Sequence, residues 1–218
     1  MLVSLPEIKQ YLRVSYDDDD ALLEQLLVTA QELCMAVARL HDDEAIAAST
    51  NQLRIGILYA VAYTLKMSYK TDYRIEGFFD YVVPPLEGFW WQDGVGGIDY
   101  SDKSTFNWIS VIRLPDFVTQ KDFDWATGEA EKKKHLDCSK AEFLTIDEGL
   151  CVQLMHIGPF DDEPATVSMM NAYLLENGYE NDFSGSRLHH EIYLSDARKV
   201  APEKWKTVIR HPIKRKEA

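Results

Sequence analysis

The segment L-H-H-E-I-Y-L-S-D, residues 188–196, has the alternating pattern typical of a β-strand and carries a glutamate at its centre. Side chains of a strand alternate between its two faces, so His189, Glu191 and Tyr193 share one face while His190 lies on the other. A carboxylate in the middle of a strand is costly if it is buried without a partner. Something must therefore compensate Glu191: solvent on an exposed face, a buried lysine or arginine, or a functional site built around it.

Aromatic side chains are the second feature that could do chemistry. They are Tyr59, Tyr63, Phe79, Tyr81, Phe89, Trp90, Trp91, Phe106, Trp108, Phe160 and Tyr193. Such rings can line a cavity for a planar or cationic molecule by stacking and cation–π attraction, although any one of them is also consistent with an ordinary core. Trp90 and Trp91 point to opposite faces of a strand, so we expect at least one to meet a cleft or a partner.

The spacing of the other candidate residues disfavours a metal or cofactor site. His189, His190 and Glu191 cannot bind one metal ion together, because His190 points away from the other two, and a site would need a distant ligand such as His156. The glycines near Gly94 follow tryptophans in a loop and open no helix, so they form no phosphate-binding loop. We expect neither a metal nor a cofactor.

The composition is that of a globular protein with one domain or two small ones. The 218 residues are 46% hydrophobic and carry a net charge of −13, which makes nucleic acid an improbable partner. The sequence has no run of apolar residues long enough to span a membrane and no signal-peptide pattern at its N-terminus, so we expect a cytoplasmic protein without a membrane partner. The cysteines have no paired spacing and are expected to be buried, reduced thiols: Cys34, Cys138 and Cys151.

Residues 1–50 are expected to form short helices and to be separate from a domain at residues 51–218. Ser4 and Glu7 form a capping-box pattern, and apolar residues recur at helical spacing from Asp19 to Leu40. A further helix is predicted from Thr50 to Met67.

The rest of the chain predicts an α+β fold, because runs of antiparallel strands alternate with helices that lie on one side. The predicted strands are Phe78–Val83, Leu86–Trp91, Phe106–Arg113, a hairpin of Glu142–Ile146 and Leu150–Ile157, the strand around Glu191, and Trp205–Ile213. Two helices are predicted in this part of the chain. One begins at Pro115 and ends near Lys134, and the other runs from Glu163 to Asn177. Gln92–Ser104 is expected to be a mobile loop.

Several motifs resemble, in order, those of the GyrI-like small-molecule-binding family. They are L-Y-A-V-A-Y-T-L-K-M-S (58–68), G-F-F-D-Y-V-V-P-P-L-E-G-F-W-W (77–91), I-R-L-P-D-F-V-T (112–119), E-G-L-C-V-Q-L-M-H-I-G-P-F-D-D-E-P-A-T (148–166) and H-E-I-Y-L-S-D-A-R-K-V-A-P-E-K-W-K-T-V-I-R (190–210). The resemblance covers about residues 58–213. It implies two strand-helix-strand-strand units that form an antiparallel sheet with a ligand cleft, in which Glu191 faces aromatic walls.

The resemblance also implies a function. Relatives include drug-sensing domains that bind lipophilic cations and free-standing proteins that hydrolyse the cyclopropane ring of DNA-alkylating natural products, and the motifs here are spelled closest to the latter. Glu191 would then be the general base toward water; in a binding-only or sensing protein it would be a counter-charge. The implied ligand-binding residues are Tyr63, Phe79, Tyr81, Glu87, Trp90, Trp91, His156, Phe160 and Tyr193.

The first 63 residues or so resemble a different family, the phage head-tail connector proteins of the Q-L-R-G type. The matching motifs are L-V-S-L-P-E-I-K-Q-Y-L-R-V, D-D-D-D-A-L-L, E-L-C-M-A-V-A-R and Q-L-R-I-G-I-L-Y-A-V-A-Y. The chain therefore looks like a fusion in which connector-like helices replace the first strand of the GyrI-like fold. Connector proteins assemble into rings, so these helices could mediate a homo-oligomer, and ring assembly is an alternative function.

Overall fold

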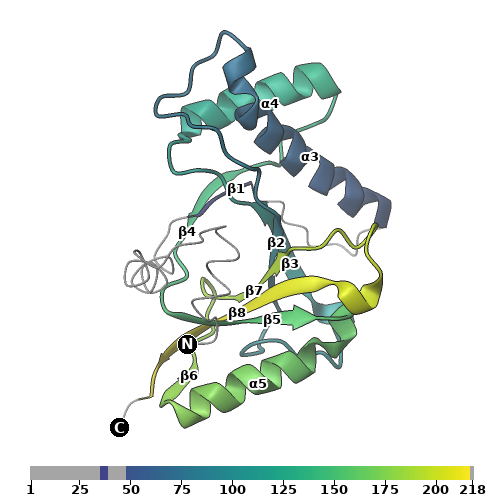
Figure 1. Cartoon of the computed structure of the whole chain (residues 1–218), viewed down its shortest axis with the longest axis vertical. Helices are drawn as coiled ribbons and strands as arrows, with labels where there is room; N and C mark the ends of the chain where they lie inside the picture. The colour runs from purple at the N-terminus through teal and green to yellow at the C-terminus, as the bar shows by residue number, and fades with distance from the viewer. Residues whose placement is uncertain (1–34, 39–47, 217–218) are drawn as a thin grey trace, which may run out of the picture. The chain divides into compact units, whose positions relative to one another are not determined.

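A computed structural model describes residues 35–38 and 48–216 of the chain. These residues divide into two compact units (Figure 1). Unit 1 contains residues 94–101 and those from Asp147 onward, and unit 2 contains 35–38, 48–93 and 102–146. The connector-like resemblance, the predicted oligomer and most of the predicted N-terminal helices fall outside the described residues and stay predictions.

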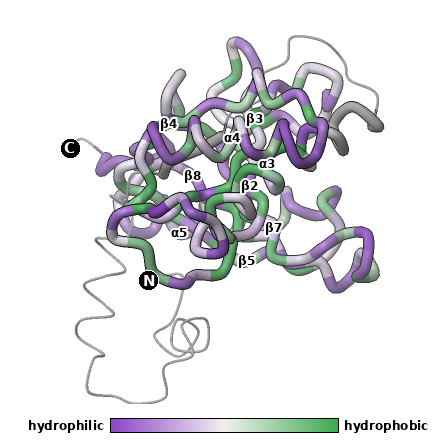
Figure 2. The backbone as a smooth tube through the Cα atoms, turned by 90° about the horizontal axis from the view of Figure 1, so that it is seen from above, coloured by the Kyte–Doolittle hydropathy of each residue, from purple (hydrophilic) through white to green (hydrophobic). Residues whose placement is uncertain are grey.

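Unit 2 is built from two helices and two pairs of antiparallel strands. Its elements are β1 (Met35–Ala38), α3 (Ala48–Lys66), β2 (Leu86–Trp91), β3 (Asn107–Ile112), α4 (Gln120–Lys134) and β4 (Phe143–Ile146). β2 pairs with β3, and β1 pairs with β4. Apolar residues of α3 such as Leu58 and Leu65 pack with Phe123 and Ala126 of α4 in one buried cluster. Figure 2 shows the contrast between the hydrophobic middle of α3 and the lysine-rich end of α4.

Helix α4 begins five residues later than the sequence suggested. Thr119 accepts a hydrogen bond from the backbone of Asp122, and the Asp122 side chain accepts one from the backbone of Thr119. This reciprocal capping box satisfies N–H groups that have no partner within the helix and so sets its start. The predicted start at Pro115 is wrong, whereas the predicted end at Lys134 is confirmed.

Two further predictions about unit 2 need correction. Residues 35–38 form a strand, although the sequence predicted a helix there, so a strand does precede α3 in this unit. The predicted strand Phe78–Val83 is absent from the structure, where this segment has no regular hydrogen-bonded pairing. Pro84 and Pro85 follow it, and because a proline has no backbone N–H it cannot donate a hydrogen bond to a neighbouring strand.

Unit 1 has the order strand, helix and then three strands, the first of which is short. Its elements are β5 (Cys151–Ile157), α5 (Glu163–Glu176), the short β6 (Tyr179–Asn181), β7 (His189–Tyr193) and β8 (Lys206–Arg215). The long strand β8 pairs antiparallel with β5, β6 and β7. Helix α5 lies against these strands through Met170 and Leu174, which are buried with Val152 and Ile209 (Figure 1). Both units mix helices with antiparallel strands, which confirms the α+β class.

The predicted hairpin at Asp147-Glu148-Gly149 does not form. Its two strands exist, but β4 pairs with β1 in unit 2, and β5 pairs with β8 in unit 1. The connecting residue Glu148 is instead held by side chains of β7 and β8. Short 3₁₀ helices lie at Ser68–Lys70, Lys103–Thr105, Phe160–Asp162 and Pro202–Lys204. In the described part of the chain, no helix is both long and apolar enough to cross a membrane.

Candidate functional site

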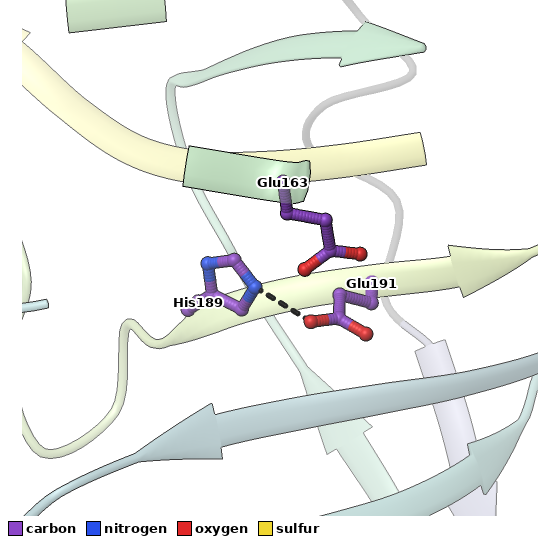
Figure 3. Close-up of side chains that lie close together, drawn as sticks. All are labelled: Glu163, His189 and Glu191. Atoms are coloured by element: carbon purple, nitrogen blue, oxygen red, sulfur yellow. Dashed lines mark hydrogen bonds and ion pairs between the residues drawn. The ribbon is translucent and has the colours of Figure 1, made fainter. Parts of the chain in front are cut away.

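Glu191 lies in the middle of β7 and is buried, with 8% of its surface exposed. Its Oε1 atom is 2.9 Å from Nε2 of His189, which is 1% exposed (Figure 3). The two residues share one strand face, as the alternating sequence predicted. Among the residues that the structure describes, the partner of Glu191 on this face is therefore a histidine and not a lysine or arginine.

A second buried carboxylate completes the group in Figure 3. Glu163 is the first residue of α5 and is 2% exposed. One ligand atom from each of Glu163, His189 and Glu191 lies within 4.8 Å of the others; we call these residues the carboxylate cluster. Glu163 was not among the predicted site residues. Only the pairing of β5, β8 and β7 brings the start of α5 close to β7, and no sequence spacing signals this.

His211 extends the cluster on the side of β8. Its Nε2 atom is 2.7 Å from Nδ1 of His189, so Glu191, His189 and His211 form a continuous series of hydrogen bonds that we call the histidine relay. His211 is 4% exposed. Burial, assisted by the neighbouring His189, lowers the pKa of His211 to about 3, which keeps its ring neutral near pH 7.

Tyr100 brings a phenol to the same cluster. Its ring meets that of His189 edge-on, with 6.4 Å between the centroids. Burial, together with the charges of Glu163 and Glu191, raises the pKa of Tyr100 well above its ordinary value, so the phenol keeps its proton and can donate a hydrogen bond. Sequence reasoning placed Tyr100 in a mobile loop and missed it.

The carboxylate cluster can accept a proton, donate one or neutralise a cation. Two buried carboxylates at this separation repel each other unless a proton or a cation lies near both. In the structure, Nε2 of His189 is engaged by Glu191 and Nδ1 by His211, and the carboxylate of Glu163 lies beside this pair. The arrangement suits acid–base chemistry, and its three ligand atoms are also close enough together to hold a cation.

The opposite face of β7 carries a separate ionic network. His190 and Arg210 are both hydrogen-bonded to the carboxylate of Glu148, at 2.9 and 2.6 Å. Burial alone would raise the pKa of Glu148, but the hydrogen bonds and charges of His190 and Arg210 outweigh burial and lower it to about 2. This network links β7 and β8 on the face opposite to Glu191, and it does not form part of the cluster around Glu191.

Three other predicted ligand-binding residues lie in unit 1. Both ring nitrogens of His156 are engaged, one with Thr166 and the other with the carbonyl of Pro159, each at 2.9 Å. His156 thus holds the turn after β5 and would have to break a bond to reach a ligand. Phe160 and Tyr193 meet edge-on, with 5.9 Å between ring centroids, and so form a small aromatic contact.

The remaining predicted residues lie in unit 2, and two of them line a pocket there. Phe79 and Tyr81 border a pocket of about 360 Å³ together with Phe117 and Arg113. Phe79 is 61% exposed, and the phenol oxygen of Tyr81 is buried. The pocket therefore combines three aromatic rings with aliphatic residues and with one oppositely charged pair, Arg113 and Asp116.

The other four are distributed over α3 and β2. Tyr63 on α3 is 53% exposed, whereas Glu87 on β2 is 4% exposed. Trp90 stacks on Trp108 of β3 at 5.6 Å, and Trp91 is half-buried. Trp90 is therefore partly committed to packing within unit 2, and the expectation that one of the paired tryptophans meets a ligand stays a prediction.

Known structures share this architecture. An uncharacterized conserved protein from Listeria innocua is 42% identical, with a TM-score of 0.75 over 83% of this chain and 88% of its own. A hydrolase from Listeria innocua is 41% identical, with a TM-score of 0.74 over the same shares of the two chains. EcmrR in a DNA complex is 14% identical, with a TM-score of 0.51 over 97% of this chain and 69% of its own, which shows the fold alone.

No curated protein matches the sequence. Residues 47–214 match the GyrI-like small molecule binding domain, and the chain therefore belongs to the GyrI-like family.

Proposed function

We propose that the protein binds a planar, hydrophobic small molecule beside the carboxylate cluster and hydrolyses a strained cyclopropane ring in it. The observation that carries the proposal is the buried carboxylate of Glu191, which is held by His189 beside a second carboxylate, Glu163. The family binds small molecules, and one similar structure is that of a hydrolase. Residues 51–218 would form the ligand-binding domain.

The reaction needs a base that takes a proton from water and an acid that protonates the oxygen of the carbonyl conjugated to the cyclopropane. Glu191 would take a proton from water, and the water oxygen would bond to a ring methylene as the carbon–carbon bond breaks. The bond's electron pair moves onto the carbonyl oxygen, which takes a proton from Glu163 in its acid form. Tyr100 would donate a hydrogen bond to that oxygen while negative charge develops. The net reaction adds one water.

Recognition of the ligand is proposed for aromatic side chains. Phe160 and Tyr193 offer ring faces and edges in unit 1. The unit 2 set stays a prediction: Tyr63, Phe79, Tyr81, Glu87, Trp90 and Trp91. His156 is a weaker candidate than these, because both of its ring nitrogens already have partners.

Incubation with a synthetic spirocyclopropyl cyclohexadienone tests the proposal. Mass spectrometry should find the water adduct with the unmodified protein, and Glu191→Gln should slow its formation by about 100-fold, the usual contribution of a general base. Glu176→Gln is the matched control, because Glu176 is an exposed residue at the end of α5. Turnover by Glu191→Gln at the unmodified rate, with unchanged circular dichroism, would remove Glu191 from the mechanism.

Binding without turnover is the second candidate, and the pair of buried carboxylates favours it, since they could neutralise a lipophilic cation. Titration with tetraphenylphosphonium distinguishes the two functions. A binding-only protein should bind this cation, lose affinity in both Glu163→Gln and Glu191→Gln, and form no adduct with the cyclopropane compound.

A further inference from the structure

We propose that His211 is a positioning residue that fixes the proton of His189 on Nε2, so that His189 always donates to Glu191 and keeps it available as the base. This inference rests on the proposed function. The geometry behind it is the histidine relay: 2.7 Å from His211 to His189 and 2.9 Å from His189 to Glu191.

Only one arrangement of the protons on His189 and His211 gives every N–H group of the histidine relay an acceptor. Among the described residues, Nδ1 of His211 has no hydrogen-bond partner. If His211 carries its proton on Nε2, it donates to Nδ1 of His189, and Nε2–H of His189 donates to Glu191. Every N–H then has an acceptor, and Glu191 accepts as a carboxylate.

The reverse arrangement is disfavoured on two grounds. It places a proton on Nδ1 of His211, where a buried N–H would have no acceptor, and such orphaned donors are rare and costly. It also turns the lone pair of Nε2 of His189 toward Glu191, which would then need a proton of its own. Glu191 could not act as a base in that state.

The neutral state of His211 helps to fix the direction of the hydrogen bonds in the histidine relay. Burial and the adjacent His189 lower its pKa to about 3. A ring that stays neutral near pH 7 holds one proton and can donate it in only one direction. The ring of Phe183 packs edge-on against His211 at 4.9 Å between centroids, which helps to keep its orientation.

The strands that carry the relay make its geometry rigid. β7 and β8 pair antiparallel, with His190 opposite Arg210 and Glu191 opposite Ile209. Continuing this register by one position places His189 opposite His211, and residues directly opposite in an antiparallel pair have their side chains on the same face. The relay is therefore held by backbone pairing on two ordered strands.

Nitrogen-15 NMR of the histidines tests the tautomer directly in the full chain without any ligand. Near neutral pH, both His189 and His211 should show a protonated Nε2 and an unprotonated Nδ1. A proton on Nδ1 of His189, alone or in an imidazolium, would overturn the inference. This measurement does not depend on whether the protein is an enzyme.

A pair of variants tests the consequence for turnover of the spirocyclopropyl cyclohexadienone. His211→Phe removes the donor, and we expect kcat to fall by about 100-fold with KM nearly unchanged, as when a base loses its oriented histidine. His211→Gln can still donate to Nδ1 of His189 and should retain most of kcat. Equal kcat for His211→Phe and the unmodified protein would contradict a positioning role.

The two experiments separate failure of the inference from failure of the proposed function. If Glu191→Gln turns over normally, the proposed hydrolysis at Glu191 is wrong, whatever the NMR shows. If Glu191→Gln is inactive but His211→Phe is fully active, the hydrolysis stands and the relay is wrong. Should His211→Phe fail to fold, the NMR of the unmodified protein still decides the tautomer.

Discussion

Nδ1 of His190 lies 2.9 Å from Oε1 of Glu148, on the face of β7 opposite to the one that carries Glu191. The adjacent His189 serves the other face, where it is hydrogen-bonded to Glu191. Two neighbouring histidines thus bind two different glutamates. The first pair belongs to an ionic network that includes Arg210, and the second belongs to the candidate site, so their roles can be separated by substitution.

The Glu148 network should make stability depend on acid pH. The folded protein holds the pKa of Glu148 at about 2, below its ordinary value, so the unfolded state takes up a proton first as the pH falls. The contribution is complete above about pH 4.5 and is lost as the pH falls toward 2; it amounts to about 3 kcal/mol. Urea unfolding from pH 7 to pH 3 should show about 2 kcal/mol of this loss.

Glu148→Gln provides the comparison for that measurement. Near pH 7 the variant should be less stable, because Arg210 loses its charged partner. The difference between the two proteins should shrink as the pH falls below about 4.5, since Glu148 then takes up a proton in the unfolded state and the unfolded state gains stability. A difference that stays constant from pH 7 to pH 3 would show that Glu148 does not titrate as described.

Glu163→Gln should affect turnover without reducing stability. The amide has the shape of the carboxyl group and, like the acid form of Glu163 that the mechanism uses, carries no charge, so the substitution adds no charge to the carboxylate cluster. We expect turnover of the cyclopropane compound to fall by about 100-fold, because the acid for the carbonyl oxygen is lost. Both expectations, lower turnover and unreduced stability, are checked by measuring adduct formation and urea midpoints for Glu163→Gln and for the control Glu176→Gln. A lower midpoint with normal turnover would assign Glu163 a purely structural role.

Tyr81 gives a test of the pocket in unit 2. Its phenol oxygen is buried and has no hydrogen-bond partner among the described residues, and burial raises its pKa to about 12. Tyr81→Phe should therefore leave the free energy of unfolding unchanged or raise it by up to about 1 kcal/mol. If Tyr81 binds the ligand, the same variant should weaken binding, as titration with a fluorescent aromatic probe would show.

Tyr73→Phe is the matched control for that substitution. Tyr73 also lies in unit 2, and its phenol donates to Asp122 at 2.9 Å. Loss of this bond should destabilise the protein by about 1 kcal/mol without an effect on the aromatic probe. Equal effects of the two substitutions on stability would mean that the phenol of Tyr81 has a partner after all.

The sequence was informative where local periodicity decides the structure. The two-residue alternation around Glu191 predicted β7 and the shared face of His189 and Glu191, because a strand has a period of two. Helix α5 matches the helix predicted from Glu163 to Asn177, which the break at Gly158-Pro159 and the closing Gly178 indicated. These elements depend on neighbouring residues, which a single sequence displays.

The sequence could not show which strands pair or which residues meet Glu191. Glu163, His211 and Tyr100 come from the start of a helix, a late strand and a loop, and only the pairing of β8 with β5 and β7 brings the first two together. The hairpin prediction failed for the same reason: the turn residues were suitable, but Glu148 is held by His190 and Arg210, and each strand has a different partner. Tertiary pairing overrides local turn chemistry here.

Gly97 should matter for the position of Phe183 and, through it, of His211. The φ angle of Gly97 is +115°, a backbone conformation that residues with a side chain rarely adopt. A Cβ atom added at this position would also lie 3.1 Å from the ring of Phe183. Gly97→Ala should therefore cost about 1–3 kcal/mol in the free energy of unfolding. It should also lower turnover, because Phe183 packs on His211 of the histidine relay.

Gly96→Ala is the control, since a Cβ atom there meets nothing within 4 Å. It should change the urea midpoint and the rate of adduct formation very little. If both alanine variants lose turnover to the same extent, the effect comes from the loop's general flexibility and not from the contact with Phe183. If neither does, the contact between residue 97 and Phe183 does not influence the histidine relay, and the expected effect of Gly97→Ala on turnover is wrong.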